Sequence, residues 1–262
     1  MKQSLSLSGV ILSVVLLASC GNSQLDASLT AQSASGTALA AAKTEPTEAR
    51  LTVPESKIKF NNLFYGEPLR METEKTKCRN NTTDAVCKQG FKLYHIGNVG
   101  DAHLPLLQIL IVDPSTIKDT ALKAYADTLV ANIDGGQKSL SASDDLFGKF
   151  NNEKTLAVLK GTQGEKNGNK YYSFYTVNEK NKTQSLYYTT AKKLGNELVM
   201  LKLNAGVNQE TKKESFNAYK DCGATCTAEQ KAASYIEKKE GFATYKTLLD
   251  KVNTMLVSFE TK

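Results

Sequence analysis

The sequence contains two histidines, and these are the first residues to test for catalysis. His95 lies in an alternating apolar–polar segment, and His103 follows Asp101 in the turn Gly-Asp-Ala-His. If the fold brings His95, His103 and Asp101 together, they could form an acid–base or metal-binding cluster. The sequence has no Gly-x-Ser-x-Gly motif, phosphate-binding glycine loop or His-Glu-x-x-His motif beside them. A ligand-binding or hydrolytic pocket at His95 and His103 is therefore kept as the alternative to a non-enzymatic binding function. Apart from this candidate pocket, we expect no catalytic residue.

Four of the five cysteines form two closely spaced pairs. Cys78 and Cys87 are nine residues apart, and Cys222 and Cys226 are four apart. In an exported protein an even number of cysteines indicates disulfides. Three connectivities can be drawn, and the local pairing within each couple fits the spacing best. A thioredoxin-like redox pair would have two residues between its cysteines, whereas Cys222 and Cys226 have three. A four-cysteine zinc site would have a short spacing in both pairs, whereas Cys78 and Cys87 are nine residues apart. We therefore expect neither.

A tyrosine-rich segment provides a candidate contact surface. In a strand, alternation puts Tyr171 and Tyr175 on one face and Tyr172 and Phe174 on the other. One set should pack under a helix, and the other is either core or an exposed platform. Tyrosine buries a large area on binding while tolerating water. If a face is uncovered, we expect Tyr171, Tyr175 and Tyr187 to contact a partner protein.

Charge and acidic motifs point away from nucleic acid, cofactors and metals. The net charge is +6, but the basic residues comprise 30 Lys and only 3 Arg. Phosphate recognition favours the planar fork of Arg, whereas Lys is the common solvated surface charge. Asp144 and Asp145 lack the ligand spacing of a calcium loop. We therefore expect no nucleic-acid partner, no cofactor and no metal.

The N-terminus carries a pattern for export and lipid attachment. Lys2 precedes the apolar run Val10–Leu17, which is too short to span a bilayer and is followed by Ala18, Ser19 and Cys20. The four residues Leu17-Ala18-Ser19-Cys20 resemble the lipobox of bacterial lipoproteins. That resemblance implies diacylglycerol on the Cys20 sulfur, cleavage before Cys20 and acylation, for example by palmitate, of the new N-terminus. A plain secretory signal with a nearby cysteine is the alternative.

The same resemblance implies a location. Gly21 rather than Asp follows the lipidated cysteine, which in a Gram-negative cell resembles the signal for the outer membrane. We expect an exported protein anchored to the envelope, on either the periplasmic or the surface face. Residues 1–19 form the signal peptide, residues 20–50 an Ala/Ser/Thr-rich flexible tether, and residues 51–262 a single globular domain.

Periodicity within residues 51–262 predicts an α+β fold. Strands are expected at residues 58–60, 69–73, 91–96 and 104–112, followed by a helix that Asp113-Pro114-Ser115 opens and Gly135-Gly136 ends. Four further strands with short polar connectors predict an antiparallel meander: residues 155–162, 170–177, 183–190 and 197–204.

The C-terminal part is predicted to be helical. Thr227 and Gln230 resemble a capping box before a helix that reaches about Glu240, and a broad apolar stripe between Phe242 and Phe259 predicts a second helix lying across the meander. The predicted fold class is an antiparallel sheet, made of the meander plus the N-terminal strands, flanked by helices as an α/β/α sandwich.

This order of elements resembles the PsbP-like family from about Phe91 to Phe259. The Cys222–Cys226 insertion before the last helix is a departure from it. The PsbP-like family includes small bacterial lipoproteins. The resemblance implies a non-enzymatic accessory or assembly factor, but it identifies no site residue in this chain. We therefore expect a membrane-anchored lipoprotein that binds another envelope protein.

Overall fold

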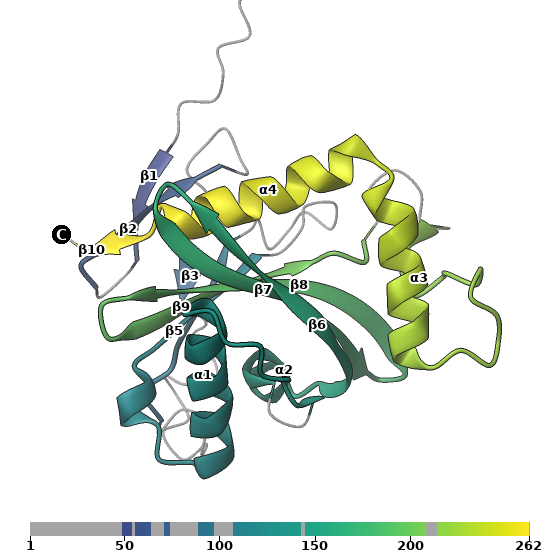
Figure 1. The fold of residues 1–262 in the computed structure, drawn as a ribbon, viewed down its shortest axis with the longest axis horizontal. Coiled ribbons are helices and arrows are strands. Elements are labelled where there is room, and N and C mark those ends of the chain that lie inside the picture. Colours follow the sequence, from purple (N-terminus) through teal and green to yellow (C-terminus); the bar gives the residue numbers. More distant parts are fainter. Residues whose placement is uncertain are drawn as a thin grey trace, which may run out of the picture. The chain divides into compact units, whose positions relative to one another are not determined.

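A seven-stranded antiparallel sheet forms the middle layer of the fold (Figure 1). The computed structural model describes residues 49–53, 56–63, 71–73, 89–96, 107–142, 145–207 and 214–261. Neighbouring strands follow the order β3 (Met71–Thr73), β4 (Lys92–Ile96), β5 (Leu107–Val112), β9 (Glu197–Asn204), β8 (Thr183–Leu194), β7 (Asn169–Lys180) and β6 (Lys154–Lys166). The predicted antiparallel meander is confirmed, and β9 joins it to the earlier strands by pairing with β5.

Two-residue turns connect the first three strands of the meander. Asn167 and Gly168 join β6 to β7, and Asn181 and Lys182 join β7 to β8; all four residues have positive φ. Positive φ at both central positions is the conformation of a type I′ turn, whose twist matches that of the strands it connects. The turns therefore fix a tight register through the meander.

Helix α1 (Thr120–Ile133) covers one face of the sheet together with the short helix α2 (Leu146–Asn151) (Figure 1). The helix begins later than predicted. Pro114–Thr116 form only a separate 3-10 turn, because Ile117 is extended, and Asp119 caps α1 by accepting a hydrogen bond from the Leu122 amide. The sequence prediction also missed α2, whose six residues are too few for a periodic pattern.

Helices α3 (Ala228–Glu240) and α4 (Ala243–Val257) cover the other face (Figure 1). The predicted capping box is present, since the Thr227 hydroxyl accepts from the Gln230 amide and the Gln230 side chain accepts from the Thr227 amide. The α/β/α layering is therefore confirmed, with separate apolar clusters on the two faces of the sheet.

A second, three-stranded sheet lies at the C-terminal end of α4. It consists of β1 (Ala49–Thr52), β2 (Ile58–Asn62) and β10 (Glu260–Thr261). The prediction that the N-terminal strands extend the main sheet is thus correct for β3 to β5 and wrong for β2, and β1 was not predicted. The rings of Phe60 and Phe259, both fully buried, stack with centroids 4.5 Å apart and join the small sheet to the core.

Replacing Phe259 with Ala should therefore destabilise the domain strongly. Truncating a fully buried Phe removes its apolar contacts and leaves a cavity, which lowers the free energy of unfolding by about 3–5 kcal/mol. Urea unfolding measures the change, with Phe242→Ala as the matched control, because the Phe242 ring is half exposed and its loss should change stability by less than about 0.5 kcal/mol. Equal effects of the two substitutions would contradict the assignment.

Candidate functional site

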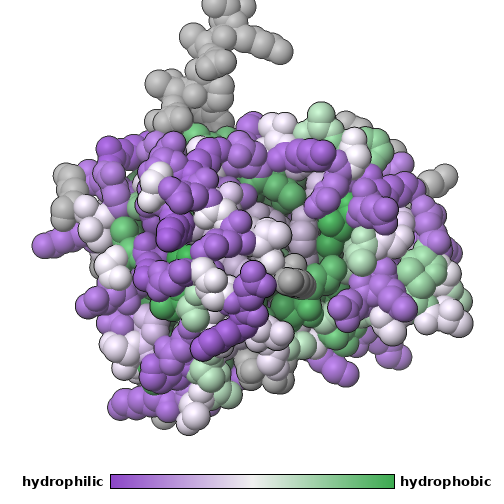
Figure 2. Space-filling view, viewed as in Figure 1, coloured by the Kyte–Doolittle hydropathy of each residue, from purple (hydrophilic) through white to green (hydrophobic). Residues whose placement is uncertain are grey.

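A groove of about 590 Å³ lies between α3, α4 and the strands β6 and β7. Figure 2 shows hydrophobic residues inside a hollow between the two helices. The floor contains Tyr171, Tyr175 and Tyr188, and we call this cavity the tyrosine groove. Helix residues line its walls: Ala233, Ile236 and Glu240 from α3, and Lys246, Leu249, Asp250 and Asn253 from α4.

Tyr171 lies at the outer end of this groove. It is half-buried and stands directly opposite Gly164 on β6. A side chain at Gly164 would collide with the Tyr171 ring, so the ring occupies the space that the glycine leaves. Gly164 is therefore the residue that allows Tyr171 to lie flat toward the edge of the sheet.

Tyr175 is more firmly part of the core. It packs against two apolar clusters, and its hydroxyl accepts a hydrogen bond from the Tyr245 hydroxyl at 3.3 Å. Its ring meets the Tyr188 ring edge-on at 5.1 Å, and the Tyr188 hydroxyl donates to Asn253. Burial raises the pKa of Tyr175 well above its ordinary value, and it raises the pKa of Tyr245 to about 12. Of these tyrosines, Tyr171 is thus the better placed for a partner.

Tyr187 does not join Tyr171 and Tyr175. Neighbouring residues of β8 point to opposite faces, so Tyr188 lies with them in the tyrosine groove and Tyr187 lies on the α2 side. There its hydroxyl donates to Glu153 at 3.2 Å, and its ring lies 3.8 Å from the Lys202 ammonium. Tyr187 therefore belongs to a different, buried polar cluster.

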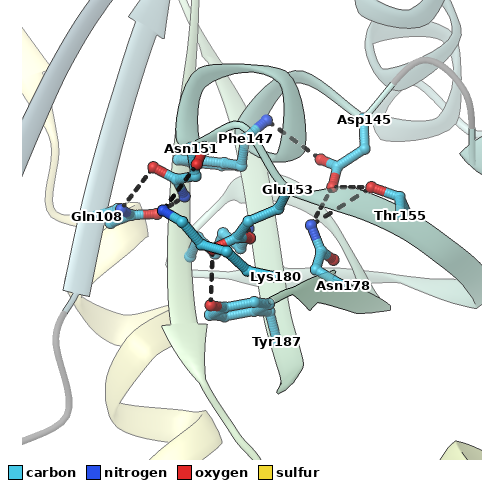
Figure 3. A network of polar contacts seen from close by, with 10 residues as sticks. Gln108, Asp145, Phe147, Asn151, Glu153, Thr155, Asn178, Lys180 and Tyr187 are labelled. Carbon is cyan, nitrogen blue, oxygen red and sulfur yellow. Dashed lines mark hydrogen bonds and ion pairs between the residues drawn. The ribbon is translucent and has the colours of Figure 1, made fainter. Parts of the chain in front are cut away.

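That polar cluster anchors α2 to the sheet (Figure 3). The buried Asp145 carboxylate caps α2 through the Phe147 amide and accepts hydrogen bonds from Thr155 and Asn178. Gln108 of β5 and Asn151 at the end of α2 exchange side-chain hydrogen bonds. These contacts explain why a six-residue helix with little propensity of its own is held in one position.

Lys202 is the unusual member of this cluster. Its side chain is 1% exposed, and its ammonium lies 3.6 Å from Glu153 Oε2 and has no hydrogen-bond partner among the described residues. Desolvation lowers the pKa of Lys202, while the charges of Asp145 and Glu153 oppose that shift. Since the ammonium faces Glu153 and the rings of Tyr187 and Phe147, the arrangement is an internal ion pair.

A second groove, of about 610 Å³, lies on the α1 side of β6. Its lining includes Gly135 and Gly136 after α1, Gly161 in β6, and Tyr172 in β7, and we call it the glycine groove. A side chain at Gly161 would collide with the Tyr172 ring, so the same glycine–tyrosine arrangement recurs on this face. Gln163 closes one end by donating to the Ile133 carbonyl at the end of α1.

Of the residues in the histidine hypothesis, the structure describes His95 alone. His95 is half-buried in β4, opposite Gln108 and Glu72. Asp101 and His103 lie outside the described residues, as do Asp144 and Cys20, the residue predicted to carry lipid. Within the described part of the chain, no group of three or more His, Cys, Asp or Glu residues could hold a metal ion.

The cysteine predictions fall in two regions. Cys222 and Cys226 are joined by a disulfide, which is one of the two bonds of the local connectivity. Cys78 and Cys87 lie outside the described residues. The Cys222–Cys226 bond closes a short loop immediately before α3, consistent with a structural role.

Comparisons with known proteins find similarity to solved structures. No protein-family model matches the chain, and no curated protein does. Among solved structures, the solution structure of cyanobacterial PsbP (CyanoP) from Synechocystis sp. PCC 6803 is similar, with a TM-score of 0.39 and 12% sequence identity. The similarity covers 83% of this chain and 94% of that one. It assigns no residue and no activity to this chain.

Removing either charge of the Lys202–Glu153 pair alone should weaken the fold. Lys202→Met leaves the Glu153 carboxylate without its nearest counter-charge, and its Oε2 has no hydrogen-bond partner among the described residues; Glu153→Gln leaves the buried ammonium unpaired in the same way. Each single variant should therefore lower the free energy of unfolding by about 3 kcal/mol, whereas the double variant should lose less than the sum of the two. Urea unfolding of both single variants and the double variant measures this. Additive losses would show that the two charges do not stabilise each other.

Alkaline pH should destabilise the floor of the tyrosine groove. Tyrosine ionises near pH 10 when unfolded, whereas burial raises the pKa of Tyr245 to about 12 and that of Tyr175 further. The contribution of these phenols to stability is therefore complete below about pH 10 and is lost as the pH rises through about 12. Unfolding followed at each pH measures this, and Tyr245→Phe should make the decline shallower. An unchanged decline would place the titrating groups elsewhere.

Proposed function

We propose that this chain is exported, anchored to the cell envelope through lipid on Cys20, and binds another envelope protein without catalysing a reaction. The lipobox-like residues Leu17-Ala18-Ser19-Cys20 support the anchor. Among the described residues, no helix has both the length and the apolar character needed to cross a bilayer. In this proposal the acyl chains on Cys20 hold the protein at the membrane, each buried CH₂ contributing about 0.8 kcal/mol.

The observation that supports binding is the tyrosine groove. It combines a half-buried aromatic floor with polar and charged side chains at its rim, a combination typical of protein contact surfaces. Its charged walls include Glu240 and Lys246, and Asp250 is partly neutralised by an ion pair with Lys166 at 2.7 Å. Tyr171 is the residue we propose as the central contact.

Capture from intact cells tests the anchor and the partner together. The full-length protein is cross-linked in cells, purified and analysed by mass spectrometry beside Cys20→Ser, which cannot be lipidated. We expect one envelope protein to be enriched with the anchored form and depleted with the variant. Equal enrichment with both forms would contradict a membrane-dependent role, and an empty capture would direct attention to ligands near His95 and His103.

Tyr171→Ala should weaken that capture without unfolding the domain. A buried tyrosine anchor contributes about 2 kcal/mol or more to an interface, equivalent to about a thirtyfold change in affinity. The melting temperature should change little, because Tyr171 is only half-buried, whereas Tyr175→Ala should also lose stability. Val207→Ala is the control, since Val207 is exposed and does not line the groove. Undiminished capture by Tyr171→Ala would exclude Tyr171 as the contact.

A further inference from the structure

Strand β6 forms one end of the main sheet. Among the strands that the structure describes, β6 pairs with β7 alone, so its outer edge faces no other described strand. Two one-residue bulges, between Thr155 and Ala157 and between Leu159 and Thr162, interrupt its register. Such bulges limit unwanted edge pairing. Thr162–Lys166 is the longest regular segment, and it is as long as a typical strand.

The turn after β6 determines which backbone groups face this edge. Lys166 and Asn169 close the two-residue type I′ turn and therefore form a hydrogen-bonded pair. Hydrogen-bonded and non-hydrogen-bonded pairs alternate along an antiparallel ladder. The N–H and C=O groups of Gln163 and Glu165 must then point away from β7, and both residues are exposed. The edge thus offers two donors and two acceptors to an added strand.

The two grooves meet at this edge. Leu159, Thr162 and Gln163 line both the tyrosine groove and the glycine groove. Tyr171 flanks the edge on one face of the sheet and Tyr172 flanks it on the other, each ring occupying the space beside a glycine of β6. An added strand directs successive side chains to opposite faces. Its alternate residues would therefore enter the two grooves.

The two grooves indicate the chemistry of the occupant. Charges beside the edge are largely balanced, since Lys166 pairs with Asp250 at 2.7 Å and Glu165 stands opposite Lys170. Glu240 and Lys246 likewise both line the tyrosine groove. Net charge therefore does not select the segment. Because each groove has room for a large side chain, the matching segment carries large apolar residues at alternate positions.

We propose that Thr162–Lys166 accepts an extended segment of the partner protein as an eighth strand, whose large apolar side chains enter the tyrosine groove and the glycine groove in alternation. Main-chain hydrogen bonds then supply affinity and the two grooves supply specificity. This inference rests on the proposed function and names the recognition mode of the same site.

Peptide selection followed by amide exchange tests this mode. A phage library of random dodecapeptides is selected on the full-length protein in detergent micelles, and one enriched peptide is synthesised as the probe. We expect enriched peptides to carry large apolar residues in an alternating pattern that fits an added strand. At saturating probe, exchange at the Gln163 and Glu165 amides should slow at least tenfold, while the Gly164 and Lys166 amides, already bonded to β7, provide the internal control.

A matched pair of substitutions isolates the backbone donor. Glu165→Pro and Glu165→Thr both remove the carboxylate, but only Glu165→Pro removes the outward N–H. An edge strand tolerates proline at a position whose N–H faces outward. Probe affinity should fall at least tenfold with Glu165→Pro and less than threefold with Glu165→Thr. Three results would each overturn the proposal. They are amide exchange at Gln163 and Glu165 that the probe does not slow, equal probe affinities of the two variants, and self-association of the protein through this edge. Envelope-protein capture that persists with Glu165→Pro would overturn strand addition while leaving the proposed function intact.

Discussion

The type I′ turn at Asn167 and Gly168 is the constraint on which the proposed site depends. By closing the hairpin with two residues, it sets Gly164 opposite Tyr171 and Gln163 opposite Tyr172. A slip of one residue would move every side chain of β6 to the other face. The turn therefore positions both tyrosine rings over glycines, opens both grooves and leaves the backbone of Gln163 and Glu165 directed outward.

The remaining polar features of the domain are structural. Asp145, Asn178 and Thr155 hold α2 against the sheet, and Lys202 is enclosed with Glu153 beneath the Tyr187 ring. Lys192 likewise donates to the Val257 and Phe259 carbonyls and fixes the end of α4. Among the described residues, the tyrosine groove and the glycine groove lie beside β6, whose outer edge pairs with no other described strand. This is why we propose that a partner binds there.

Local signals in the sequence predicted most of the fold. Alternation and turn residues identified β6 to β9, and Thr227 with Gln230 identified the start of α3. Long-range effects were inaccessible: α2 depends on tertiary hydrogen bonds to Asp145, and β2 pairs with β10, about two hundred residues away. Of the residues in the proposed site, Tyr171 was named from the sequence, whereas Gly161 and Gly164 were overlooked. A glycine inside a strand pattern signals a bulge or a close approach, and that signal was present.

Site-specific photocross-linking in living cells tests the central assignment most directly. A photoreactive phenylalanine analogue replaces Tyr171 in the full chain, and in a separate strain it replaces the exposed Val207, outside both grooves. The account predicts that position 171 cross-links one envelope protein, through an extended segment of that protein, and that position 207 does not. Cross-linking of the same protein from position 207 alone would place the interface elsewhere and contradict the account.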